Sequence, residues 1–246
     1  MKKFFKFFSI IIISFLFFTP LNETNAQKNQ LTDEESSFSN TLKNDYVHLL
    51  NDNVLSKDTT YEEWLEITGI LENGISYDLE EDFNEKLEIV DPLTNSITTS
   101  IKKGDILISN HTIKNGLTGH AGIALSSTQV LHIAGPRHYP EVLSVNNFVK
   151  KYRKTLTVYR VPNSKIANAA ADWASRNYVG RKYHYAITDN IKSKNPTYCS
   201  KIVFQAYYYG TGSAPVIKTV PKIALPYALP AYFSPAYKPK VVGKFN

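Results

Sequence analysis

The chain has 246 residues and a single cysteine, Cys199. One cysteine cannot form an internal disulfide, and it cannot supply the several thiolates of a cysteine-rich zinc site. Acidic residues are also scarce in the second part of the chain. From Thr98 to Asn246 there are 21 Lys or Arg and only four Asp or Glu, a net charge of +17. A surface with this balance attracts anions.

The chain also lacks a strong membrane-span signal at its N-terminus. The apolar run from Phe7 to Phe18 is shorter than the ~20 residues that a bilayer span needs. It follows three lysines and precedes Pro20 and a Thr-Asn-Ala exit at residues 24–26. This pattern predicts a secretory signal peptide over residues 1–26, although a retained anchor is an alternative. Because no cysteine lies nearby, we expect no lipoprotein anchor and no permanent membrane anchor. We expect a secreted, extracellular protein, with cell-wall association left open.

The next segment has the opposite charge. From Gln27 to Ile97 there are four Lys and seventeen Asp or Glu, a net charge of −13. Apolar residues recur at helical spacing between Thr32 and Asp58, and again after the cap signal at residues 58–60, which predicts two helices. Residues 74–95 fit either a third helix or an irregular linker. We therefore expect an acidic helical N-terminal segment at 27–97, which serves either as an inhibitory or as a structural cover of the basic domain.

The basic domain, residues 98–246, has a different pattern. Short β-branched runs with period two predict strands, and they lie at Asp105 to Ser109, Ala121 to Leu125, Val130 to Ala134, Val142 to Val145 and Leu156 to Val161. One helix should begin at a Ser164 cap, and a second should run from a Thr197 cap to Tyr209. The proline-rich tail after Ser213 should wrap the domain in extended form. The fold class is thus α+β, with a small antiparallel sheet packed against the cysteine-bearing helix.

Cys199 is expected within the first turn of its helix. Unpaired backbone N–H groups and the helix dipole favour a negative charge there, so we expect a stabilised thiolate. The alternative is a buried, inert cysteine.

A hairpin should supply the partner of this sulfur. If the turn is centred on Ser126, His120 faces His132 across the strands, and alternation places both rings on one face. Gly122 and Ala124 on the same face would leave room for the cysteine helix and its sulfur.

A thiol, a base and a polar group that orients the base meet the requirements of nucleophilic catalysis. Cys199, His120 and His132 fill these roles in that order, and Asp189 is an alternative orienting group. A metal site made of the two histidines is also open, but no nearby acid supplies the third ligand of zinc. We therefore expect no metal and no cofactor.

These residues carry a family resemblance. The motifs Gly-Asp-Ile-Leu at 104–107, Gly-His-Ala-Gly-Ile at 119–123 and Tyr-Cys-Ser-Lys-Ile-Val at 198–203 together resemble circularly permuted papain-like hydrolases. In this NlpC-type branch, which includes YiiX-like members, the histidine strand precedes the cysteine helix. The resemblance implies a permuted papain-like catalytic domain with Cys199 as nucleophile and His120 as base. A second histidine twelve residues after the first also resembles the lecithin retinol acyltransferase group, whose members handle acyl esters.

The resemblance also implies where substrate binds. Residues 180–185 resemble the family's substrate-side loop, so we expect Tyr183 and Tyr185, with Tyr198 of the cysteine motif, to contact substrate. The oxyanion would be held by the backbone N–H of Cys199 and a second donor. The tyrosines fit ordinary core packing equally well.

The expected function is a secreted cysteine hydrolase that cleaves an amide bond in cell-wall-derived peptide through an acyl-enzyme. A lipid or acyl-ester hydrolase or acyltransferase with the same site is one alternative. A non-catalytic module that binds wall or membrane polymers is another. Expected partners are an anionic wall polymer or peptide, or a lipid. Nucleic acid is not expected, because no nucleic-acid fold signature accompanies the charge. The oligomeric state is left open.

Overall fold

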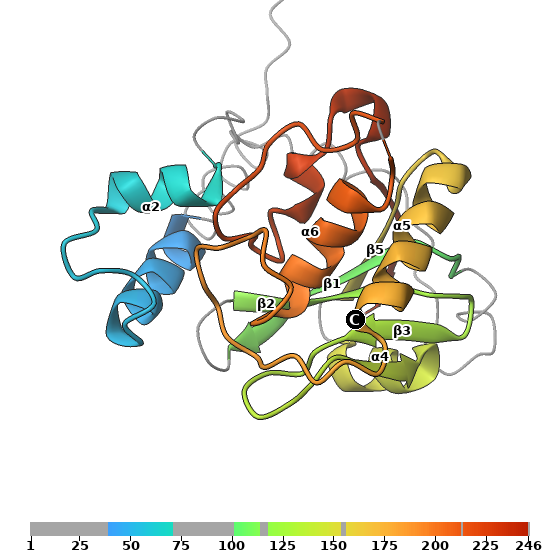
Figure 1. Ribbon diagram of the computed structural model, residues 1–246, viewed down its shortest axis with the longest axis horizontal. Helices are drawn as coiled ribbons and strands as arrows, with labels where there is room; N and C mark the ends of the chain where they lie inside the picture. The colour runs from blue at the N-terminus through green and yellow to red at the C-terminus, as the bar shows by residue number, and fades with distance from the viewer. Residues whose placement is uncertain (1–38, 71–100, 114–117, 154–155, 213, 246) are drawn as a thin grey trace, which may run out of the picture. The chain divides into compact units, whose positions relative to one another are not determined.

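The computed structural model describes residues 39–70, 101–113, 118–153, 156–212 and 214–245. Their centre is a six-stranded antiparallel sheet in the order β4-β3-β2-β1-β5-β6 (Figure 1). The strands are β1 Ile106–Ile113, β2 Thr118–Ala124, β3 Gln129–His132, β4 Glu141–Ser144, β5 Leu156–Arg160 and β6 Lys240–Phe245. The predicted α+β class is confirmed.

Helices and short 3-10 turns accompany the sheet. They are a helix over residues 39–51, α2 Tyr61–Thr68, α4 Val145–Tyr152, α5 Ser164–Tyr178, α6 Cys199–Tyr209, η2 Leu229–Tyr232 and η3 Pro235–Tyr237. Among the described helices none has the length and apolar character to cross a membrane. The predicted signal peptide at 1–26 and the undecided segment at 74–95 lie outside the described residues.

The sheet is buried on both faces. Ile106 and Ile108 of β1 join one apolar cluster with residues of α5 and α6, whereas Leu107 joins a second cluster with Phe148 of α4. Successive side chains of a strand point to opposite faces, so a strand covered on both sides reads as a continuous apolar run. The cysteine-bearing helix therefore packs on one face and α4 on the other.

Several local predictions need correction. The cap of α5 is Asn163, whose side chain accepts from two helix N–H groups, and the N-cap of α6 is Tyr198, with no side-chain cap bond. The predicted Thr197 cap lies one residue too early, so Cys199 is the first residue of α6. The tail does more than wrap the domain, because β6 pairs with β5 as an edge strand. The helix α4 is absent from the sequence prediction.

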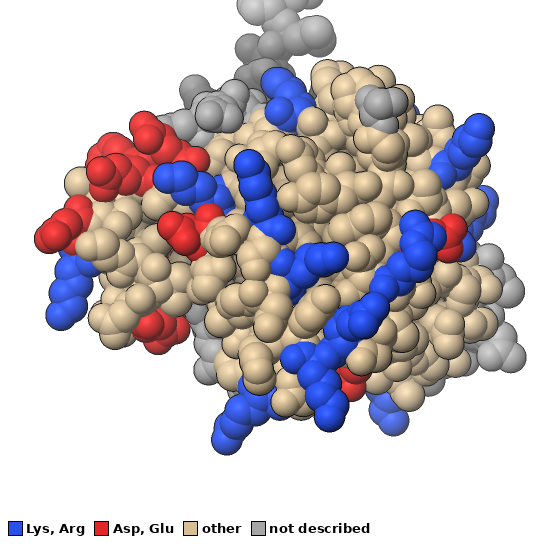
Figure 2. Space-filling view, in the orientation of Figure 1, with Lys and Arg blue, Asp and Glu red and all other residues tan. Residues whose placement is uncertain are grey.

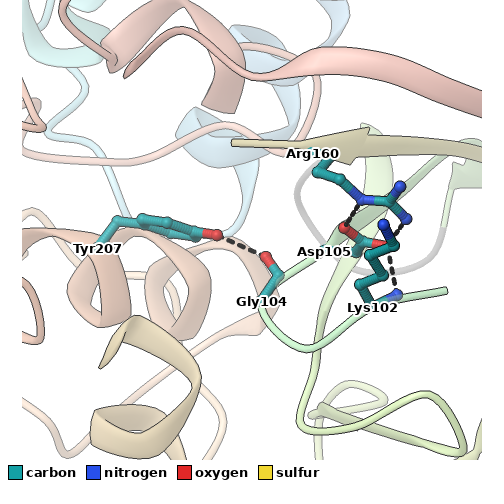
Figure 3. Close-up of polar contacts among 5 residues, drawn as sticks. All are labelled: Lys102, Gly104, Asp105, Arg160 and Tyr207. Carbon is teal, nitrogen blue, oxygen red and sulfur yellow. Dashed lines mark hydrogen bonds and ion pairs between the residues drawn. The ribbon is translucent and has the colours of Figure 1, made fainter. Parts of the chain in front are cut away.

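A buried ion pair joins the start of β1 to the end of β5. Asp105, which is 1% exposed, accepts from Arg160 Nε at 2.8 Å and Nη2 at 2.7 Å, and from the backbone N–H of Lys102 at 2.7 Å (Figure 3). Beside it, the hydroxyl of Tyr207 in α6 donates to the carbonyl of Gly104. Two-point guanidinium bonds of this kind fix geometry as well as charge. The Tyr207 contact joins α6 to the segment that leads into β1, the strand that pairs with β2 of the histidine hairpin.

The described part of the acidic segment packs against the C-terminal tail. The Tyr227 hydroxyl donates to Asp45 at 3.0 Å, and the Tyr232 hydroxyl donates to the carbonyl of Thr68 at 3.0 Å. The helix α2 has a complete capping box between Thr60 and Glu63, as its sequence indicates. Residues 39–70 thus share their apolar cluster with the sheet and α6.

Candidate active site

The two histidines of the hairpin form a direct hydrogen-bonded pair. His120 Nε2 lies 3.0 Å from His132 Nδ1, and the rings meet edge to face at 86°. His120 is 5% exposed and His132 is fully buried. The prediction that these rings are neighbours on one face is confirmed.

The predicted register of the hairpin is wrong by two residues. The turn is centred on Ser127, since the N–H of Leu125 donates to the carbonyl of Gln129. Ala124 therefore pairs with Val130, and not with Thr128 as predicted. A register shift of two residues leaves every side chain of the strand on the same face of the sheet. His120 thus reaches His132 diagonally.

The face that carries the histidines is covered by α4, which contradicts the expectation that the cysteine helix lies there. Tyr152 stacks on His120 with ring centroids 4.2 Å apart and planes at 21°. Phe148 lies 5.8 Å from the ring of His120 and 5.3 Å from that of His132. A Cβ at Gly122 would meet the Phe148 ring at 3.0 Å. The space left by this glycine is therefore filled by the aromatic wall of α4.

The helix α4 was not predicted from the sequence, although the sequence contains a pattern that indicates it. Ser144 caps α4 by accepting from the N–H of Asn147 at 3.2 Å. The apolar residues Val145, Phe148, Val149 and Tyr152 then follow at i, i+3, i+4 and i+7, the spacing of an amphipathic helix. The eight-residue helix begins directly after β4. The alternating pattern of β4 runs directly into this helix, so the change from strand to helix periodicity is hard to recognise in the sequence.

Cys199 approaches the histidine strand from the opposite face of the sheet. It belongs to the same apolar cluster as Ala121 and Ile123 of β2. Its sulfur accepts a hydrogen bond from the backbone N–H of Ala121, the residue after His120. The strands β2 and β3 pair at Ile123 and Ala124, and Ala121 lies beyond this pairing. The sulfur therefore lies next to the residue of β2 that follows His120.

Burial sets the protonation states of the candidate nucleophile and base. Burial raises the pKa of the Cys199 thiol, against hydrogen bonds from Ala121 and Ser200 that lower it. Burial lowers the pKa of His120 well below its usual range, and the charges of His132 and Lys151 lower it further. At rest, Cys199 is therefore a neutral thiol and His120 a neutral imidazole. The thiolate expected from the helix start is not the resting form, because desolvation outweighs the helix-end N–H groups.

His132 has a second close neighbour. Its pKa is lowered to about 3 by burial first, and then by the charges of Lys151 and His138. Its Nε2 lies 3.4 Å from Glu141 Oε1 on β4, which pairs directly with it. The two atoms do not meet hydrogen-bond geometry, and Nε2 is without a partner among the described residues.

The three tyrosines predicted to contact substrate take different positions. Tyr183 is partly exposed and meets the ring of Tyr178 edge to face. Tyr185 is partly exposed; burial and then the Cys199 charge raise its pKa. Tyr198 is fully buried, and its hydroxyl accepts from the backbone N–H of Ala224 at 3.0 Å. Tyr198 therefore supports the start of α6, and both Tyr185 and Tyr198 lie within electrostatic reach of the sulfur.

Buried polar side chains of α6 hold the segment that leads into it. The ammonium of Lys201 donates to the carbonyls of Asn190 and Pro196 at 2.7 and 3.0 Å, and burial lowers its pKa to about 8. Gln205 donates to the carbonyls of Ile191 and Ser193. These bonds fix the approach to Cys199, and the sequence offered no specific signal for them.

The structure also bears on Asp189 as the alternative orienting group and on the alternative of a metal site. Asp189 is exposed in the segment between α5 and α6, whereas the ring of His120 is hydrogen-bonded to the ring of His132. Across the part of the chain that the structure describes, no group of three or more His, Cys, Asp or Glu side chains is arranged to hold a metal ion.

A Bacillus thuringiensis protein named "Uncharacterized 30.3 kDa protein" is 38% identical over 157 residues, covering 59% of this chain and 58% of the relative. The chain thus spans somewhat more than half the length of that relative. No solved structure matches the chain.

The family comparison reaches most of the described domain. Residues 83–245 match the model described as "Lipoprotein N-acylation protein LnsA-like", a stretch that includes both histidines, Glu141 and Cys199. The chain belongs to the family of LnsA-like lipoprotein N-acylation proteins.

Proposed function

We propose that this protein is a cysteine-dependent acyltransferase that takes an acyl chain from an ester lipid and passes it to an amine of a lipoprotein. The observation that carries the proposal is the hydrogen-bonded pair of buried histidines beside the strand position where the Cys199 sulfur sits. The family description adds the chemistry, since N-acylation requires a nitrogen acceptor. Among the expected functions, the lipid and acyl-ester alternative fits this family, and nothing favours the wall-peptide amide.

The first half of the reaction forms an acyl-enzyme. His120 takes the proton of the Cys199 thiol as the sulfur attacks the ester carbonyl. The backbone N–H of Cys199, the first residue of α6, would stabilise the oxyanion. The ester C–O bond then breaks, and His120 returns the proton to the departing alcohol. The products are a thioester on Cys199 and a lysolipid.

The second half transfers the acyl chain. An amine attacks the thioester carbonyl while His120 accepts a proton, and collapse of the intermediate releases an amide and restores the thiol. Water in place of the amine would release a fatty acid, which is the hydrolase variant of the same site. The order of the motifs, with the histidine strand before the cysteine helix, supports a permuted papain-like framework for this chemistry.

We further propose that the enzyme works outside the cytoplasm, at the membrane surface. The signal-peptide pattern of residues 1–26 supports export, and mass spectrometry of the exported protein should find Gln27 at its N-terminus. Lys and Arg side chains gather along α5 on the face shown in Figure 2. A basic face is suited to anionic lipid head groups.

The experiment that tests this function follows both products. Purified protein is incubated with diacyl phospholipid vesicles and a lipopeptide with a free N-terminal amine, and the lipids, peptide and intact protein are weighed by mass spectrometry. We expect lysolipid, acylated peptide and, at short times, one acyl chain on Cys199. Cys199→Ala and His120→Ala should each lower the rate at least about a thousandfold, and circular dichroism should show that each variant still folds.

Controls and alternative substrates make the test decisive. His48 is exposed on the first helix, so His48→Gln should retain wild-type rates. A parallel incubation with cell-wall peptides examines the amide alternative. Cleavage of those peptides without any lysolipid would overturn the lipid substrate, and equal rates in wild type and Cys199→Ala would overturn the mechanism.

A further inference from the structure

Glu141 occupies a distinctive place beside the histidine pair. It lies directly opposite His132 across β3 and β4, and its carboxylate oxygen is 3.4 Å from the buried Nε2 of that ring. The Glu141 side chain is 43% exposed, so it can rotate into hydrogen-bond alignment without repacking the core. Nε2 of His132 has no other partner among the residues that the structure describes. A buried ring nitrogen without a hydrogen-bond partner lowers the stability of the folded protein.

The other acids of the basic domain are placed elsewhere. Only four acids occur from Thr98 onward. Asp105 is bound by Arg160, Asp172 is bound by Lys103 at 2.6 Å, and Asp189 is exposed between α5 and α6. Among the four acids of this domain, Glu141 is therefore the one that lies beside the histidine pair.

A hydrogen bond from His132 to Glu141 would set the protons of both rings. A carboxylate can only accept, so Nε2 of a neutral His132 must carry the proton, which leaves its Nδ1 as an acceptor. His120 Nε2 lies 3.0 Å from that acceptor and must then be the donor. The unprotonated Nδ1 of His120 is thereby left to take the thiol proton.

We propose that Glu141 is a positioning residue that fixes the tautomers of His132 and His120 so that His120 serves as the base. The assignment rests on the proposed function for its catalytic meaning, but the proton arrangement stands on geometry alone. Lys151 and His138 face the pair with positive or titratable groups, and Tyr152 covers it with a neutral ring. The negative charge of Glu141 also offsets the imidazolium that forms on His120 during proton transfer.

The tautomers are measurable without any turnover. Long-range proton–nitrogen NMR of the ¹⁵N-labelled full chain assigns the protonated nitrogen in each ring. In the wild type we expect a proton on Nε2 in both His120 and His132. Glu141→Ala should give mixed tautomers at His132, whereas Glu141→Gln should keep the wild-type pattern because its amide oxygen still accepts.

Enzyme kinetics give a second measurement of the positioning role of Glu141. Glu141→Ala should lower kcat about tenfold with KM unchanged, and Glu141→Gln should lower it less, as expected when an orienting bond survives but its charge does not. Glu62→Ala, which removes an exposed acid of α2, should change neither the spectrum nor the rate.

The two proposals fail in different ways. Wild-type ring-nitrogen signals in Glu141→Ala would overturn the positioning role, whatever the activity. A tautomer shift in Glu141→Ala, in a protein that forms no lysolipid or acyl-enzyme, would support the positioning role and remove the proposed function. If Glu141→Ala does not fold, a Glu141→Gln spectrum with protons moved from Nε2 overturns the assignment.

Discussion

His120 and His132 are neutral in the folded protein, and this state links stability to pH. Burial is the main cause of both lowered pKa values, and the pKa of His132 falls to about 3. In the unfolded chain, a histidine has a pKa of about 6.5. Between these values the unfolded chain binds more protons than the folded one. Stability is therefore complete above about pH 6.5 and is lost as the pH falls toward 3.

The free energy of unfolding should reflect these two residues. Measured by urea denaturation between pH 7 and pH 4, it should fall by up to about 1.4 kcal/mol per pH unit for each titrating histidine. His132→Asn should flatten this dependence, because one buried proton acceptor is gone. His48→Gln, at an exposed position, should leave the slope unchanged. An identical slope in wild type and His132→Asn would show that His132 is protonated in the folded state.

At this same scale, the sequence predicted that the two histidines are neighbours, but not that they are neutral. Cys199, His120 and His132 could be singled out because of their chemistry and spacing. Their protonation depends on desolvation by Tyr152, Phe148 and the core around them. Those neighbours come from α4, and a single sequence does not give the packing that buries a group.

At the scale of elements, α4 controls the placement of the histidine pair. Gly122 is the point of close contact, because an added Cβ would lie 2.7 Å from Val130 Cγ1 and 3.0 Å from the Phe148 ring. The contact under 3.0 Å, with Val130, forces a shift of β2 or β3, and the Phe148 ring of α4 must also give way slightly.

Gly122→Ala should therefore destabilise the protein by about 1–3 kcal/mol, as other overpacked cores do. It should also lower the acyl-transfer rate, since Tyr152 would move away from its stacked position on His120. Thermal unfolding and the vesicle assay check both effects. Gly212→Ala tests a glycine whose Cβ would meet nothing within 4 Å but whose φ is +67°. It should cost stability through backbone strain alone and leave the rate unchanged. A Gly122→Ala protein with wild-type stability would contradict the packing role.

The hairpin shows how far a sequence pattern reaches at this scale. Alternation predicted the common face of His120 and His132, because a strand has a fixed period of two. The register depended on whether the turn is centred on Ser126 or Ser127, and Ser126, Ser127 and Thr128 carry no glycine or asparagine to specify a turn type. The geometry of the turn was therefore settled by the packing of the strands.

At the scale of the whole molecule, the acidic segment was expected to be either inhibitory or structural. Residues 39–70 bury Trp64 completely and leave Asp45 only 1% exposed, with Asp45 bonded to Tyr227 of the tail. The contacts described are those of a structural cover over the C-terminal tail. They favour a stabilising role for this part of the segment.

Tyr227→Phe should therefore lower the free energy of unfolding by about 1–3 kcal/mol, because it removes a hydrogen bond to a buried carboxylate. Deletion of residues 27–70 should lower the melting temperature further and reduce solubility. Tyr209→Phe removes the hydroxyl of an exposed tyrosine and should have little effect. A faster acyl transfer in Tyr227→Phe, at unchanged stability, would instead identify the segment as inhibitory.

The sequence by itself determined the opposite charges of residues 27–97 and 98–246, the α+β class, and the histidine pair on one strand face. Each of these follows from composition or from a short-range period, which neighbours in the chain are enough to define. The tertiary structure alone decided that α6 and α4 cover opposite faces, that Glu141 lies against His132, and that burial keeps thiol and imidazole neutral. These features depend on contacts between segments far apart in the chain, where packing and desolvation outweigh local preference.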